Sequence, residues 1–344
     1  MSKSRLFGRL LLFLFMSIPL VDISALKDTG KDPQNTANHI AEACLEYGFF
    51  YIKGHGVSKQ LQDRLQTLSW SFFKQDQAAK QLISIKKGGR AWRGYFGVGD
   101  ELTSGKPDVK EGLYFGQELA ADHPLVRART PMHGANLFPD IPGFRETVME
   151  YMQALTTLGH TLMRGIAISL ELPADYFQIR YLKDPLVLFR IFHYPETSEN
   201  QREQKLWGVG EHTDYGVLTI LKQDEVGGLQ VKSQDQWIKA PYIPDTFICN
   251  IGDMLDRLTG GFYRSTPHRV LNSSSQGRLS FPLFFDPNYH SEVEPVDLSH
   301  LSHSAPQSYR RWDGADLQVF TGTYGEYLLQ KVAKVFPQLV QEVR

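Results

Sequence analysis

Three residues that lie far apart in the chain have the types and spacing of a metal site. His212 and Asp214 lie in the run GEHTDYG, and His268 lies in the run STPHRV. Two imidazoles and one carboxylate on one side of a metal ion leave further coordination positions open, and this is the ligand set of non-heme Fe(II) oxygenases. The pattern therefore indicates a catalytic metal centre.

The two-residue spacing of His212 and Asp214 favours a β-strand that carries both side chains. Alternate residues of an extended strand point to the same face, so both can reach one ion. The run VLTILKQ follows directly, and its β-branched and apolar residues are typical of strands. His268 must then come from another strand that the fold brings alongside. No cysteine lies near these three residues, so a structural zinc site is not expected.

Arg278 and Ser280, in the run GRLSFPLFF, repeat the two-residue spacing and should share one face of a strand. Arginine presents a planar, charged fork that binds a carboxylate through two hydrogen bonds, and the serine hydroxyl adds one donor. A buried arginine needs an anion beside it. The sequence offers no obvious acidic partner here, so we expect the carboxylate of a ligand to fill this role.

Several further runs, together with these residues, resemble one known family. The chain, from about Ile18 to its C-terminus, is similar to the isopenicillin N synthase-like family of 2-oxoglutarate and Fe(II)-dependent dioxygenases. The runs that carry the resemblance are IPLVDIS, GFFYIKGHGV (48–57), FRIFHYP (189–195), GGLQV (227–231), NIGD (250–253) and SFPLFFDPN (280–288).

The resemblance implies a role for each residue of the site. His212, Asp214 and His268 would bind Fe(II), and Arg278 and Ser280 would hold the distal carboxylate of the cosubstrate 2-oxoglutarate.

Tyr194 stands where many family members have a tyrosine that helps to bind the cosubstrate, whereas Phe192 replaces an asparagine that is frequent two residues earlier.

The reaction that the resemblance implies is the oxidation of a small molecule by O2, such as hydroxylation or desaturation, with release of succinate and CO2 and with ascorbate as a possible reductant. Two alternatives stay open at this point. Some relatives use the same Arg-x-Ser pair on another carboxylate and need no 2-oxoglutarate, so the chain could be an Fe(II) oxidase of the same fold. The other alternative is a jelly-roll protein that binds a metal or ligand without turnover.

The segment 86–118 is rich in glycine, aromatic and charged residues, and in the family the matching region borders the substrate pocket. Arg93, Tyr95 and Phe96 are therefore candidates for contact with the substrate. An ordered surface loop with packed aromatic side chains explains the same composition.

Composition narrows the class of protein. The chain has 344 residues, a net charge of −1, 42% hydrophobic and 22% charged residues, which are globular values. No run of Lys or Arg suggests nucleic-acid binding. The two cysteines, Cys44 and Cys249, have no metal-type spacing and favour a reducing, cytoplasmic location.

The N-terminus contains the apolar run LLLFLFM (10–16) after three basic residues. The run resembles a secretory signal but is too short to span a bilayer, so no stable membrane association is expected. No small-x-small cleavage site follows it, and MSIPLVDIS would be a natural start for the catalytic fold. We therefore interpret residues 1–15 as an upstream extension or a mis-assigned start, with an export signal as the alternative.

The elements that must position the site follow from the pattern of apolar residues. Helical periodicity predicts helices over 32–48, over 59–75, from Phe144 onward and near the C-terminus. Short strands separated by turn residues crowd the stretch from Leu186 to Phe285 and predict a mainly β fold with flanking helices, whose core is a double-stranded β-helix (a cupin-like jelly roll).

We expect residues 16–344 to form a single catalytic domain. Its parts are a mixed N-terminal part (16–180), the jelly-roll core (181–290) and a C-terminal loop and helix (291–344).

Overall fold

The computed structural model describes residues 17–197, 207–233, 236–271, 274–301 and 311–335. The N-terminal run LLLFLFM lies outside these residues, and with it both interpretations of that segment. Among the helices of the described ranges, none is both long and apolar enough to cross a membrane.

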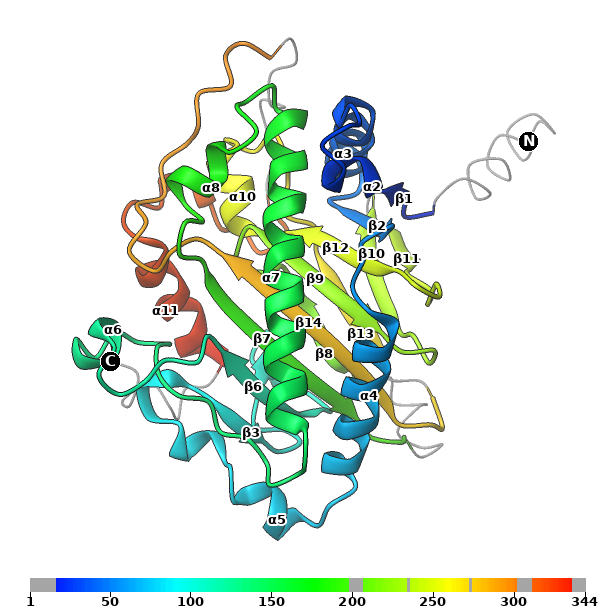
Figure 1. Cartoon of the computed structure of the whole chain (residues 1–344), viewed down its shortest axis with the longest axis vertical. Coiled ribbons are helices and arrows are strands. Elements are labelled where there is room, and N and C mark those ends of the chain that lie inside the picture. The colour runs from blue at the N-terminus through cyan, green and yellow to red at the C-terminus, as the bar shows by residue number, and fades with distance from the viewer. Residues whose placement is uncertain (1–16, 198–206, 234–235, 272–273, 302–310, 336–344) are drawn as a thin grey trace, which may run out of the picture.

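A large sheet of eight strands runs through the centre of the molecule (Figure 1). Its strand order is β1-β2-β12-β9-β14-β7-β6-β3. All pairings are antiparallel except that of β1 with β2. In chain order the strands are β1 (Leu20–Asp22), β2 (Phe49–Lys53), β3 (Gly94–Phe96), β6 (Glu111–Gly116), β7 (Leu186–Tyr194), β9 (Leu218–Gln223), β12 (Phe247–Ile251) and β14 (Arg278–Asp286).

A second sheet of four strands completes the core. Its order is β11-β10-β13-β8, with all pairings antiparallel. The strands are β8 (Trp207–His212), β10 (Leu229–Ser233), β11 (Gln236–Lys239) and β13 (His268–Leu271). A short hairpin of β4 (Leu102–Thr103) and β5 (Lys106–Pro107) stands apart from both sheets. The two larger sheets and the flanking helices confirm the expected jelly-roll fold.

Helices cover the outer face of the large sheet, with α7 running across it (Figure 1). Gly159 of α7 lets the helix approach closely, since a Cβ atom there would lie 2.8 Å from the ring of Phe285 on β14. The helices are α2 (Ser24–Lys27), α3 (Gln34–Glu46), α4 (Lys59–Phe73), α5 (Gln77–Gln81), α6 (Pro124–Arg127), α7 (Phe144–Ser169), α8 (Tyr176–Arg180), α10 (Asp253–Leu258) and α11 (Tyr324–Val335), with single 3-10 turns at Ile85–Lys87, Gly89–Ala91 and Leu317–Val319.

The sequence of β14 shows how the sheet separates the helical core from the interior of the barrel. The apolar residues Leu279, Phe281, Leu283 and Phe285 are fully buried on the face that packs against the helices. The residues that alternate with them, from Arg278 to Asp286, line an internal cavity. This two-residue alternation is the strand periodicity, and it places the polar residues of β14 toward the candidate site.

Candidate active site

The two candidate histidines face each other across neighbouring strands of the smaller sheet. His212 is the last residue of β8, His268 is the first residue of β13, and the two are direct partners in the antiparallel pairing. This confirms that a second strand brings His268 alongside. Asp214, however, lies two residues beyond the end of β8, so the expectation that one strand carries both His212 and Asp214 was wrong for the aspartate.

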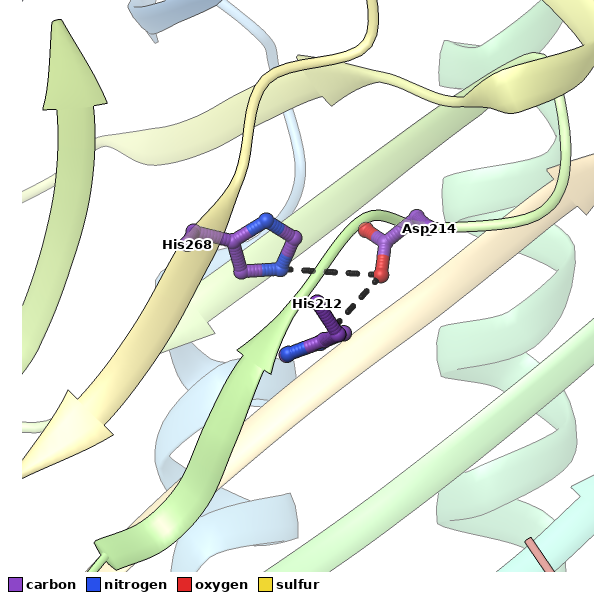
Figure 2. A group of neighbouring side chains, drawn as sticks. All are labelled: His212, Asp214 and His268. Atoms are coloured by element: carbon purple, nitrogen blue, oxygen red, sulfur yellow. Dashed lines mark ion pairs between the residues drawn. The ribbon is translucent and has the colours of Figure 1, made fainter. Parts of the chain in front are cut away.

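The three side chains converge although Asp214 is not on the strand (Figure 2). The Oδ1 atom of Asp214 lies 3.7 Å from Nε2 of His212 and 3.6 Å from Nε2 of His268. One ligand atom from each residue lies within 4.8 Å of the other two, a spacing that suits a single metal ion. Asp214 can reach the site because the chain turns inward directly after β8, toward β9 and β12.

Hydrogen bonds from neighbouring groups orient all three residues. The Nδ1 atoms of His212 and His268 lie 2.8 Å and 3.2 Å from the backbone oxygens of Gly210 and Thr266, so each Nδ1 carries the proton and donates it. Both Nε2 lone pairs are therefore left for a metal, since partners of this kind fix the tautomer of metal-binding histidines.

The carboxylate of Asp214 is held in the same way. Its Oδ2 accepts hydrogen bonds from Thr219 Oγ1 on β9 (2.6 Å) and Asn250 Nδ2 on β12 (2.7 Å). Its Oδ1, which faces the two histidines, is left for a metal. The donor set of two nitrogens and one oxygen thus fits Fe(II).

Burial sets the protonation state of the more enclosed histidine. Burial, and next the neighbouring His212, lower the pKa of His268 to about 4. The imidazole of His268 is therefore neutral at physiological pH, which is the form that binds metals.

Arg278 and Ser280 both lie on β14, two residues apart, as their spacing predicted. Arg278 pairs with Tyr194 of β7, and its guanidinium carbon lies 4.6 Å from the centre of the Tyr194 ring. The Arg278 side chain is buried, and none of its three guanidinium nitrogens has a hydrogen-bond partner among the described residues. A buried guanidinium with free donors suits a carboxylate ligand.

The structure corrects the expectation that Arg278 has no acidic neighbour. Asp224 follows directly after β9, and its Oδ1 lies 3.9 Å from Nε of Arg278. The Oδ2 of Asp224 accepts a hydrogen bond from the backbone N–H of Leu279. Burial raises the pKa of this carboxyl group. Asp224 therefore lies beside the Nε edge of the guanidinium, at a distance beyond a hydrogen bond.

A cavity of about 580 Å³ contains both groups of residues. One wall comes from the inward faces of β7 and β14, another from the β4 hairpin, and a third from α11 and the preceding residues Trp312 and Asp313. The candidate metal ligands and the Arg278–Ser280–Tyr194 group all line it. The site thus is a concave cavity with a largely apolar lining, as is typical of small-molecule sites.

The three candidate substrate residues do not line this cavity, as the described residues define it. Arg93 is buried and donates to the backbone oxygen of Met132. The Tyr95 hydroxyl donates to Glu111, and Phe96 packs against the ring of Tyr114. The contacts of these three residues thus fit the other explanation of the segment, an ordered loop with packed aromatic side chains.

Neighbours of these candidates line the cavity instead, namely Trp92, Tyr114 and Phe192. Trp92 and Tyr114 belong to the segment 86–118, whereas Phe192 lies on β7. Tyr114 also donates a hydrogen bond of 2.8 Å to Glu101, which forms an ion pair of 2.9 Å with the buried Lys110.

A buried ionic cluster, which the sequence did not reveal, stabilises the cavity wall formed by α11 and the residues before it. Arg311 donates to Asp253 Oδ1 (2.9 Å) and to the hydroxyl of Thr213 (3.0 Å), the residue between two of the candidate metal ligands. The carboxylate of Asp253 also accepts a hydrogen bond from Tyr327 of α11 (2.6 Å) and lies 3.4 Å from Nζ of Lys331. Burial raises the pKa of Asp253, but Arg311 and Lys331 outweigh it and hold the net pKa below its usual range.

Comparisons with known proteins agree with this geometry. Residues 18–141 match a family described as the N-terminal region of non-haem dioxygenases in morphine synthesis, and residues 180–287 match the 2OG-Fe(II) oxygenase superfamily. A probable iron/ascorbate oxidoreductase of Dictyostelium discoideum is 52% identical over 95% of this chain and 96% of its own length. A 1-aminocyclopropane-1-carboxylate oxidase of Dictyostelium mucoroides is 39% identical over 94% and 96%.

Among solved structures, that of a full-length Neurospora crassa protein in complex with alpha-KG and thymine superimposes with a TM-score of 0.75 and 28% identity, covering 92% of this chain and 96% of that one. The name alpha-KG denotes 2-oxoglutarate.

Proposed function

Because the chain belongs to the 2OG-Fe(II) oxygenase superfamily, we propose that His212, Asp214 and His268 bind the catalytic Fe(II) of a dioxygenase that oxidises a small molecule. The observation that supports this assignment most directly is the orientation of the ligands. Two Nε2 atoms and one Oδ1 atom point at one place, while the other polar atom of each side chain is already hydrogen-bonded.

Fe(II) held by these residues would supply the centre that activates O2 as 2-oxoglutarate is oxidatively decarboxylated to succinate and CO2. The protein's own contribution is binding and orientation. Arg278 and Ser280 would receive the distal carboxylate of 2-oxoglutarate, and the Tyr194 hydroxyl would add a third donor. The enclosed barrel would limit the access of water, which protects a reactive oxidant from side reactions.

The substrate of this chain is a small organic molecule whose identity the family does not determine. The names of the relatives mention 1-aminocyclopropane-1-carboxylate and thymine, which differ in charge and shape. A shared fold and metal site do not choose among such substrates. The iron/ascorbate name of one relative supports ascorbate as a reductant.

The test is iron-dependent formation of succinate by the purified enzyme. Protein supplied anaerobically with Fe(II) and 2-oxoglutarate should release succinate when O2 is admitted, and Asp214→Ala should release none above background. Oxidation of a substrate without succinate would instead support the alternative of an Fe(II) oxidase that does not use 2-oxoglutarate. A wild-type protein that binds neither Fe(II) nor 2-oxoglutarate would contradict the assignment of the site.

We also infer a cytoplasmic location. Cys44 and Cys249 are both buried and free, which is typical of proteins in reducing compartments. Fractionation of the native host, with detection of the chain by antibody, tests this inference. Recovery of the chain in a secreted fraction would contradict it.

A further inference from the structure

The cavity has a second polar region beside the candidate metal site, apart from Arg278. The inward residues of β14 run from Arg278 at one end of the strand to Asp286 at the other. Asp214 accepts a hydrogen bond from Thr219 of β9, and Thr219 lies opposite Phe284 in the pairing of β9 with β14. The candidate metal ligands are therefore closer to the Asp286 end of β14 than to the Arg278 end. If 2-oxoglutarate reaches from the metal to Arg278, the space around Asp286 is left for the primary substrate.

Asp286 is a buried carboxylate with one unused oxygen. Its Oδ2 accepts a hydrogen bond of 2.6 Å from Tyr324 of α11. Its Oδ1 has no hydrogen-bond partner, and the side chain forms no salt bridge among the described residues. The Oδ1 atom lies against Gly216, where a Cβ atom would collide with it, so only glycine leaves room for the carboxylate.

Arg190 of β7 is a buried cation that likewise has no ion-pair partner in the described ranges. Its Nη1 donates to the backbone oxygens of Phe115 and Phe189, both at 3.1 Å. The guanidinium lies 3.6 Å from the centre of the Tyr114 ring and 6.0 Å from that of Phe284. It therefore leans toward the Asp286 end of the cavity. The charges of Arg190 and Asp286 interact, but the two side chains do not form an ion pair with each other, so a ligand with both charges can lie between them.

Three other charged side chains of the wall already have opposite charges beside them. Lys110 pairs with Glu101, and Lys331 contacts Asp253. Asp313 pairs with Arg311. Leaving a buried charge without an ion-pair partner is strongly unfavourable, so a ligand that supplies the opposite charge would be stabilised there.

We propose that Arg190 and Asp286 recognise a zwitterionic substrate, namely a free amino acid. The carboxylate of the amino acid would accept hydrogen bonds from Arg190, and its ammonium group would donate to Asp286 Oδ1. The rings of Trp92, Tyr114 and Phe192 line the same cavity and would contact the side chain of the substrate. This inference rests on the proposed function, because it assigns Arg278 to 2-oxoglutarate.

The first test uses the wild-type enzyme loaded with Fe(II) and 2-oxoglutarate under anaerobic conditions. Binding of single proteinogenic amino acids is measured by calorimetry, together with the amines and acids that lack one of the two charged groups. We expect at least one amino acid to bind, and its decarboxylated and deaminated analogues to bind roughly 10- to 100-fold more weakly, since each loses a charge-assisted hydrogen bond. Admission of O2 should then give succinate release above the level without substrate.

The outcomes separate this inference from the proposed function. An enzyme that binds 2-oxoglutarate but no amino acid, or that binds an amine or an acid as tightly as the matching amino acid, would overturn the zwitterion assignment alone. An enzyme that does not bind 2-oxoglutarate would overturn the function on which the assignment depends.

Substitutions test the two residues directly. Asp286→Asn and Arg190→Gln should each raise the KM for the amino acid roughly 10- to 100-fold, and Arg190→Lys should restore part of the loss. Asp256→Asn is a matched control, since Asp256 is also a buried carboxylate but does not line the cavity. Equal losses in Asp256→Asn and Asp286→Asn would contradict a role in recognition. If a variant does not fold, the wild-type panel still decides the outcome.

Discussion

Asp224 lies beside Arg278, with its Oδ1 atom 3.9 Å from the Nε atom of the arginine. Asp224 follows directly after β9, and Arg278 is the first residue of β14. The backbone N–H of Leu279 donates a hydrogen bond to the Asp224 carboxylate, which links the two strands at this point. The arginine thus has a negative charge at its Nε edge, whereas its two Nη atoms have no hydrogen-bond partner among the described residues. We infer that Asp224 is a positioning residue for Arg278.

Asp224→Asn should therefore weaken the binding of 2-oxoglutarate. Loss of the charge would free the guanidinium to adopt other orientations, and we expect the KM for 2-oxoglutarate to rise about tenfold, equivalent to about 1.4 kcal/mol. The metal content should not change. Succinate release at varied 2-oxoglutarate gives the measurement, with Asp63→Asn on α4 as an exposed control. Loss of kcat at unchanged KM would contradict the positioning role.

Arg278→Gln should have a larger effect on the same parameter. A charge-assisted hydrogen bond contributes about 1.5–3 kcal/mol, so the KM for 2-oxoglutarate should rise roughly 10- to 100-fold while Fe(II) is retained. Arg269→Gln is the control, because the Arg269 guanidinium lies 3.8 Å from the centre of the Trp237 ring and does not line the cavity. Full activity of Arg278→Gln at low 2-oxoglutarate would exclude Arg278 as the cosubstrate ligand.

The hydrogen bond from Thr219 to Asp214 should contribute to metal affinity. Thr219→Val removes the hydroxyl without a large change of shape, and we expect Fe(II) affinity to fall roughly 10- to 100-fold, as is usual for residues that orient metal ligands. Equilibrium dialysis against Fe(II) under anaerobic conditions measures this. Thr246→Val is the control, since Thr246 donates only to a backbone oxygen outside the site. An unchanged affinity in Thr219→Val would mean that Asn250 alone is enough to orient the aspartate.

Asp286 should make the stability of the protein depend on pH. Burial raises its pKa to about 7 from an ordinary value of 3.8. Between these values the folded protein binds more protons at this group than the unfolded chain does, so this contribution to stability falls as the pH rises. Asp286→Asn cannot titrate, and its free energy of unfolding relative to wild type should rise with pH by up to about 1.4 kcal/mol per pH unit.

Urea unfolding of the metal-free protein from about pH 4 to about pH 8 measures the difference between the two proteins. The comparison isolates Asp286, because His268 has a lowered pKa and contributes a slope of the opposite sign in both proteins. Parallel stability curves for wild type and variant would show that Asp286 titrates normally.

Arg311→Met should destabilise the protein more than Lys331→Met. Both cations contact Asp253, but the Arg311 side chain is 5% exposed and that of Lys331 is 20% exposed. Removing one partner of a buried ion pair typically lowers stability by about 3–5 kcal/mol. Thermal or urea unfolding provides the measurement. A larger effect of Lys331→Met would mean that α11, and not the segment around Arg311, determines the stability of this wall.

The residues of the candidate metal site could be picked out because their combination of types is rare and because His212 and Asp214 are only two residues apart. The two-residue spacing of His212 and Asp214, and that of Arg278 and Ser280, predicts that the side chains of each pair point to the same side of the chain. The apolar, strand-like runs around them predicted a barrel. The helix patterns were also correct, as α3, α4, α7 and α11 show. The element that holds Asp214 was misjudged, because a spacing of two also occurs where a chain leaves a strand and turns inward.

The contacts that orient the candidate site residues could not be predicted from the sequence, because they join residues that are remote in the chain. Nothing near Asp224 indicates that β9 will pair with β14 and bring it to Arg278. The same is true of Arg311 and Asp253. Asp286 is different, since continuing the two-residue alternation from Arg278 and Ser280 along the strand leads directly to it.

The attachment of α11 through Asp253 has a consequence for biosynthesis. When the ribosome has made the chain as far as β14, all three candidate iron ligands and the arginine have been synthesised, but Trp312, Tyr327 and Lys331 have not. A nascent protein at that stage would have a reactive centre open on one side. Iron acquired before translation ends would therefore meet solvent, and delivery after release would spare the polypeptide from oxidative self-damage.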